Sequence, residues 1–288
     1  MHFRHLPVEL IDGVCQDLSP RDLANLSQTS ASMYPIAQRQ LYRHVEISTM
    51  SKNLSIVFTL ARRPQVTLFV RSFSVRVSSL SESFYSALAD VIAHMSELIS
   101  LLVDIDLEAS WVLNCRPRTC AYPYMSRFTT SFYLDANVAS FLTMTPALLE
   151  LSVDTVPQPS RPIPVIHHTT IPHLIRYLGS TRAAKAVIPG RPIEAVHLHS
   201  GDLAEDIVLS LAQSTASVVV LEADTQCLSI VLLELLARHL PSLAFCKITQ
   251  PFTKAPDIVS VLSGILHNKY SHGTPPSVRA STKKLPNL

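Results

Sequence analysis

The sequence lacks the glycine-rich and charge-rich patterns that mark several classes of function. Its six glycines, in 288 residues, form no phosphate-binding loop and no G-x-S-x-G nucleophile turn. The formal net charge is +2, from 24 basic and 22 acidic residues, so no broad field attracts nucleic acid or anionic lipid. We therefore expect neither nucleic acid nor a membrane surface as a partner.

Cysteine usage gives no sign of a disulfide framework or a zinc site. The five cysteines form no C-x-x-C pair and lie at Cys15, Cys115, Cys120, Cys227 and Cys246. The segment after Met1 acquires acids at Glu9 and Asp12 in place of the apolar core of a signal peptide. The longest charge-free apolar run, 207–221, is interrupted by polar residues and is shorter than the roughly 20 residues that span a bilayer. We expect reduced thiols, no membrane span and a cytoplasmic or nuclear location.

Apolar residues, in contrast, are abundant. They make up 47% of the chain, and the mean hydropathy is +0.25. This composition can bury a large core and is unlike that of a disordered chain.

The pattern of residues 7–18 predicts one amphipathic helix. Leu10, Val14 and Leu18 recur every four residues and therefore lie on one helical face. Pro7 suits the first helical position, where a missing N–H costs nothing.

Two more short helices are predicted after it. Ser19 can cap the second helix, with Pro20 at its first position and Asp22 near its positive end. Apolar residues at helical spacing over 33–41 predict the third helix, although its start is less sharply marked. The first part of the chain is thus expected to form three small helices.

Three runs in this region together resemble the F-box motif in the form common in fungal F-box proteins: Leu6-Pro-Val-Glu-Leu-Ile, then Leu18-Ser-Pro-Arg-Asp-Leu-Ala-Asn-Leu-Ser-Gln-Thr-Ser, then Leu41-Tyr-Arg-His-Val. The resemblance covers residues 4–47. It implies binding to the small adaptor subunit of a cullin-type (SCF) ubiquitin ligase while the rest of the chain selects a target protein. The adaptor contact would come from Leu6, Pro7, Glu9, Leu10, Ile11, Val14 and Leu23. Some of these apolar residues must instead close the three-helix core.

Beyond residue 48 a template of apolar-x-x-apolar-x-apolar recurs. Copies lie at residues 70–75, 98–103, 148–153, 174–179, 193–198, 218–223 and 243–248, and a blurred copy is expected within 125–133. The segments between them carry helical stripes, such as Phe84, Leu88 and Val91. Each strand-and-helix unit then has apolar faces that only the next unit can cover, which predicts a stack of parallel strands.

The repeats resemble irregular leucine-rich repeats, without a regular Asn at the turn position. The predicted fold class is therefore α/β: a three-helix F-box domain at 4–47, followed by a leucine-rich-repeat-like solenoid with parallel strands at 48–270. The segment 271–288 is expected to be a flexible tail. A non-repeating α/β domain is the alternative fold.

The repeat register predicts where a target protein would bind. Side chains alternate along a strand, so residues between the apolar positions line the open, concave face of the sheet. The predicted target-binding residues are Asp104, Ser152, Asp154, His197, His199, Glu222 and Asp224. Asp104, Asp154 and Asp224 recur at the same repeat position and could form an acidic row that binds a basic segment of the target protein. The alternative is that they are only solvated residues on the exposed side of the strands.

Two groups of residues are the best candidates for enzyme chemistry. The histidines that could gather around a metal are His167, His168, His173, His197 and His199. Cys115 and Cys120, beside two arginines, could form a reactive thiol pair. No helical H-E-x-x-H geometry is present, and we predict no metal, no cofactor and no enzymatic activity.

The sequence thus predicts a non-enzymatic substrate receptor of an SCF ubiquitin ligase. Its partners would be the adaptor, through it the cullin, and an unknown target protein. An F-box scaffold that binds a partner without ubiquitination is the first alternative, and a metal or thiol enzyme is the second.

Overall fold

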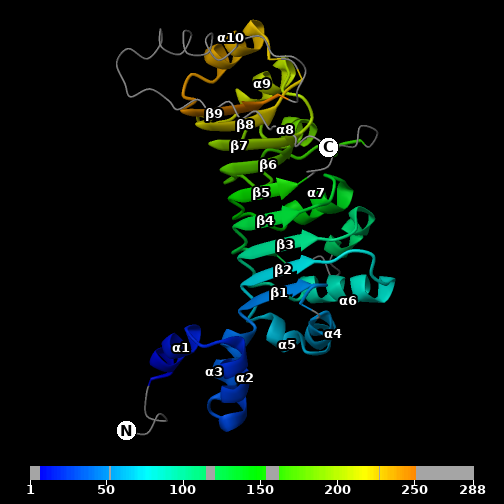
Figure 1. Ribbon diagram of the computed structural model, residues 1–288, viewed down its shortest axis with the longest axis vertical. Coiled ribbons are helices and arrows are strands. Elements are labelled where there is room, and N and C mark those ends of the chain that lie inside the picture. Colours follow the sequence, from blue (N-terminus) through cyan, green and yellow to red (C-terminus); the bar gives the residue numbers. More distant parts are fainter. Residues whose placement is uncertain (1–6, 52, 115–120, 154–161, 227, 251–288) are drawn as a thin grey trace, which may run out of the picture. The chain divides into compact units, whose positions relative to one another are not determined.

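The computed structural model describes residues 7–51, 53–114, 121–153, 162–226 and 228–250 (Figure 1). It is an α/β structure, as the sequence predicts, in which helices and parallel strands alternate along the chain. The chain divides into two compact units, Met1–Phe132 with Ala136–Leu148, and Tyr133–Asp135 with Leu149–Leu288. No helix among the described residues combines the length and apolarity that a membrane span requires.

The three predicted N-terminal helices are present, as α1 (Val8–Gln16), α2 (Pro20–Thr29) and α3 (Tyr34–Leu41). Helix α1 starts one residue later than predicted, with Pro7 at the N-cap. The Ser19 hydroxyl accepts a hydrogen bond from the backbone N–H of Asp22 at 3.2 Å, which confirms the predicted cap of α2.

The strands of the first unit are parallel and pair in chain order. They are β1 (His44–Ser48), β2 (Ser72–Arg76), β3 (Ser100–Asp104) and β4 (Arg127–Thr130). The helical segments after α3 are α4 (Ser55–Arg62), α5 (Pro64–Thr67), α6 (Glu82–Ala93), η2 (Leu107–Leu113) and α7 (Ala136–Leu142). Neighbouring helices α4 and α6, and then α6 and η2, pack side by side (Figure 1).

The second unit repeats this arrangement. Its parallel strands are β5 (Glu150–Val153), β6 (Arg176–Ser180), β7 (Ala195–Ser200), β8 (Val220–Asp224) and β9 (Phe245–Thr249). Its helices α8 (Thr181–Val187), α9 (Glu205–Leu211) and α10 (Ile230–His239) contact one another in sequence order. In both units, therefore, neighbouring repeats contact one another through their strands and through their helices.

The apolar template explains which strand residues are buried. Leu101 and Val103 of β3 are buried in the core, whereas the alternate residues Ser100 and Leu102 are half-buried and Asp104 is exposed. The blurred copy within 125–133 is β4, where Met125, Phe128 and Thr130 fill the template positions. Its last position is a threonine, which is why the pattern is weak in the sequence.

Strand β1 was not predicted. Its core residues Val45 and Ile47 lie at the end of the region assigned to the F-box, yet they pair in register with Phe73 and Val75 of β2. The last residues of the F-box region therefore also form the first strand of the sheet.

A recurring backbone contact sets the register within each unit. The carbonyl of Arg43, just before β1, accepts hydrogen bonds from the backbone N–H groups of Arg71 and Ser72, at 2.9 and 3.1 Å. The carbonyl of Arg71 in turn accepts two from the next repeat. In the second unit the same pair of bonds is accepted by the carbonyls of Leu149, Ile175, Glu194 and Val219. These bonds satisfy backbone groups where each strand begins.

Arg191 lies in the loop between α8 and β7, and its side chain is fully buried at 0% exposure. Its guanidinium donates to the carbonyls of Thr170 at 3.0 Å, His167 at 2.7 Å and Val187. Burial lowers the pKa of Arg191 to about 10, so the group still carries its charge at neutral pH. This buried cation joins the long connection before β6 to the end of α8.

Candidate protein-interaction surfaces

Helix α1 separates the predicted adaptor-binding residues into a buried set and an exposed set. Ile11 is 5% exposed and Leu23, on α2, is 4% exposed. Leu10 and Val14, on the neighbouring side of α1, are 57% and 49% exposed. Because successive helical residues are rotated by about 100°, neighbours such as Leu10 and Ile11 belong to different faces.

The buried set belongs to the core of the three helices, which is the role that the sequence left open for some of the predicted adaptor-binding residues. The members of this core are Ile11, Cys15, Leu23, Met33 and Ile36, with Leu18, Leu26 and Leu41 packed against it. The buried side chains of this core stabilise the packing of the three helices.

Of the exposed residues, Leu10 and Val14 lie on one helical side, which we call the α1 apolar face. Val8 is also exposed, at 47%, but it stands two residues before Leu10 and therefore lies on another side of the helix. Pro7 and Glu9 are exposed beside it, and Leu6 lies outside the described residues. Val8 was absent from the predicted set, although it stands directly after Pro7 in the F-box motif. Exposed apolar side chains that share a helical face form a candidate contact surface for another protein.

Polar contacts of Asp12 hold α1 against α3. Its carboxylate accepts hydrogen bonds from Arg39 at 2.8 Å and Gln40 at 2.9 Å. Burial alone would raise the pKa of Asp12, but these hydrogen bonds and the nearby arginines outweigh burial and hold the pKa below its usual value. The charged form of Asp12 thus fixes the orientation in which the α1 apolar face is presented.

Residues 3–48 match the F-box-like family. An F-box-like domain is a protein-interaction module, and F-box domains generally bind the small adaptor of SCF-type complexes. No curated protein gives a significant match to this chain. The match and the three-helix core together support an F-box protein.

The open face of the first unit brings opposite charges together. Asp104 lies beside Arg76 in the register of β2 and β3. Arg76 also approaches Glu46 of β1, with 3.4 Å between Nη1 and Oε1. Asp104 therefore stands next to a cation, and the acidic row proposed from the sequence is interrupted here by a basic side chain.

The open face of the second unit carries most of the predicted target-binding residues. Ser152, His197, Glu222 and Lys247 occupy one row across β5 and β7–β9. Glu222 lies between two cationic or ionisable groups, with Oε2 at 3.2 Å from His197 Nδ1 and Oε1 at 3.7 Å from Lys247 Nζ. Glu222 therefore has an ionisable or cationic neighbour on each of the two adjacent strands.

The remaining predicted residues lie toward the carboxyl ends of the strands. Asp224 is exposed and pairs in register with Thr249 of β9. His199 is exposed, and its ring centroid lies 6.5 Å from that of His197. Asp154 lies outside the described residues.

The histidines do not assemble into one cluster. His167 and His168 lie side by side, with ring centroids 4.1 Å apart, in the connection before β6. Across the described part of the chain, no three histidine, cysteine or acidic side chains are placed to hold a metal ion together. Cys115 and Cys120 fall outside the described residues.

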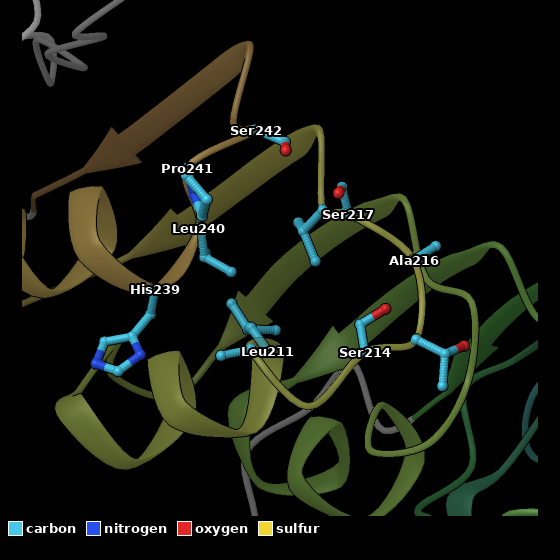
Figure 2. A pocket seen from close by; sticks show the side chains of 11 residues that line it. Leu211, Ser214, Ala216, Ser217, His239, Leu240, Pro241 and Ser242 are labelled. Atoms are coloured by element: carbon cyan, nitrogen blue, oxygen red, sulfur yellow. The ribbon is translucent and has the colours of Figure 1, made fainter. Parts of the chain in front are cut away.

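One cavity of the second unit, of about 220 Å³, lies between the end of α9 and the turn from α10 to β9 (Figure 2). Its lining consists mainly of hydroxyl and apolar side chains, and Figure 2 shows the His239 ring pointing away from Ser214. The Ser214 hydroxyl accepts from the N–H of Ile193 at 3.0 Å and lies 2.9 Å from the carbonyl of Arg191. That hydroxyl therefore anchors the loop before β7, and we assign the cavity no binding role.

Proposed function

We propose that this chain is a substrate-recognition subunit of an SCF-type ubiquitin ligase. Its F-box-like helices bind the adaptor, and through the adaptor the cullin, while the open faces of the sheet bind a target protein. The chain raises the effective concentration of the target beside the ubiquitin-loading subunits. It has no catalytic step of its own and acts in the cytoplasm or nucleus.

The observation that carries this proposal is the α1 apolar face. Leu10 and Val14 lie inside the region that matches the F-box-like family and stay exposed, while Ile11 on the same helix closes the core. A folded monomer gains nothing from these exposed side chains, whereas an adaptor would bury them.

The repeat region supports the target-binding half of the proposal. Along β2, β3 and β8, buried residues alternate with half-buried or exposed ones, so one side of these strands is buried and the other side is open. The strands resemble those of degenerate leucine-rich repeats in this respect. A broad open sheet face is suited to binding a protein rather than a small molecule.

Reconstitution with purified adaptor and cullin tests this function. We expect the full chain to co-elute with cullin on size exclusion only when the adaptor is present. Co-elution without the adaptor, or no complex in its presence, would refute the receptor role.

A scaffold that uses the F-box without ubiquitination is the alternative. Target lifetime distinguishes the two roles, because loss of a receptor lengthens the lifetime of its target, whereas loss of a scaffold does not.

A further inference from the structure

The open face of β7–β9 carries two parallel rows of unlike chemistry. Ala195, Val220 and Phe245 pair in register and form an apolar row, and all three are half-buried. Two residues further along each strand, His197, Glu222 and Lys247 form a polar row. Because side chains alternate along a strand, both rows lie on the same side of the sheet.

The spacing of the rows fits an α-helix better than an extended peptide. Neighbouring strands lie about 4.8 Å apart. A helix that follows a row, and so crosses the strands, repeats one face about every 5.4 Å. Its residues i, i+4 and i+7 therefore meet three successive strands, and the length from i to i+7 differs from two strand spacings by about 1 Å. Side chains on one face of an extended peptide repeat about every 6.7 Å and drift by about 2 Å at each strand.

The polar row sets the charge of the partner. Both carboxylate oxygens of Glu222 already have a neighbour, His197 on one side and Lys247 on the other. The ammonium of Lys247 has three donors, and its nitrogen lies 3.7 Å from Glu222 Oε1, so it can donate to a second carboxylate. An acidic residue beside the apolar stripe of a bound helix would lie close to the ammonium of Lys247.

We propose that an amphipathic α-helix of the target protein lies across β7–β9, with its apolar stripe on Ala195, Val220 and Phe245 and an acidic residue beside Lys247. This proposal rests on the proposed function and names the partner class of its target-binding face. It places the binding site for the target on the apolar row and the polar row of the second unit.

A displayed library of random peptides, selected on the complex of the full chain with the adaptor, tests the proposal. We expect the enriched peptides to carry apolar residues at i, i+4 and i+7 and an acidic residue next to that stripe. Val220→Asp should weaken their binding at least tenfold, whereas Thr129→Asp, at an exposed strand position of the first unit, should leave it unchanged.

Lys247→Ala is a second variant that leaves the apolar row intact. It should weaken the acidic peptides and reduce the salt dependence of their binding. The proposal is overturned if no peptide is enriched, if the enriched peptides lack the helical spacing, or if they bind Val220→Asp and Lys247→Ala as they bind the original chain. Adaptor affinity, measured on the same samples, reports separately on the proposed function and should not change in these variants.

Discussion

The side chain of Tyr177 occupies the space that a side chain at Gly179 would need. A Cβ atom at position 179 would lie 2.5 Å from the hydroxyl oxygen of Tyr177 and 2.1 Å from the carbonyl oxygen of Val153. The Tyr177 hydroxyl donates to the carbonyl of Ser180 at 3.1 Å, which holds the ring in place. In β6, one large side chain thus fills two positions of the apolar template.

Gly179→Ala should therefore destabilise the second unit. The added methyl group meets backbone of β5, which cannot move without breaking the strand pairing, so we expect a loss of about 2 kcal/mol or more in the free energy of unfolding. Denaturant unfolding of the full chain measures it.

Gly13→Ala is the matched control, because a Cβ atom on this exposed residue of α1 would meet nothing within 4 Å. Alanine there should stabilise the helix by about 1 kcal/mol, seen as slower hydrogen exchange of α1. If both glycine variants changed stability in the same direction, the packing of Tyr177 against Gly179 would be wrong.

Adjacent positions of α1 should respond very differently to truncation. Ile11→Ala removes a buried side chain of the three-helix core and should cost about 2–4 kcal/mol. Leu10→Ala removes an exposed one and should change stability by less than about 1 kcal/mol. Hydrogen exchange of the α2 and α3 amides checks this, and equal protection in the two variants would contradict the assignment of faces.

Arg191→Met should strongly destabilise the second unit. The substitution leaves buried carbonyls, including those of His167 and Thr170, without their donor, and we expect a loss of at least about 3 kcal/mol. Arg176→Met is the control, since Arg176 forms an exposed ion pair with Glu150 at 2.8 Å, and it should cost less than about 1 kcal/mol. Similar losses in the two variants, by denaturant unfolding, would show that the buried guanidinium has no special role.

Asp106 should give the first unit an acid-sensitive contribution to stability. The Tyr85 hydroxyl, at 2.6 Å, and the backbone N–H of Ser79 donate to its carboxylate and hold the pKa of Asp106 below its usual value. Because the pKa of Asp106 is lower in the folded chain, its carboxylate stabilises the fold at pH values above the ordinary aspartate pKa of about 3.9. This stabilisation is lost as the pH falls through the folded pKa.

The test compares the original chain with Asp106→Asn between pH 6 and pH 3. The difference in unfolding free energy should be largest at pH 6 and shrink below about pH 4. A difference that stayed constant over this range would mean that the charge of Asp106 contributes nothing.

The sequence predicted the repeats best where three apolar residues fill the template, as around Leu101 and Val103. Strand β4 was blurred because Thr130 holds the last template position, and β1 was missed because its residues also complete the F-box motif. Strands β1 and β4 are identified only by their pairing in register with neighbouring strands.

The sequence could not separate Leu10 from Ile11, since both belong to one broad apolar stripe and the position of α3 decides which of them is buried. It also could not predict the burial of Arg191. A loop with two prolines and a glycine indicates exposure, and the carbonyls that surround this guanidinium come from segments distant in the sequence. The pairing of Glu222 with Lys247 likewise depends on strand register.

The affinity of the full chain for the ligase adaptor tests the central claim most directly. We predict micromolar binding or tighter, and a loss of at least about tenfold, or 1.4 kcal/mol, in the double variant Leu10→Ala, Val14→Ala. The control pair Ile230→Ala, Val231→Ala truncates equally exposed apolar residues of α10 and should bind as the original chain does. Unchanged binding of the α1 variant, or no binding of the folded original chain, would contradict the account.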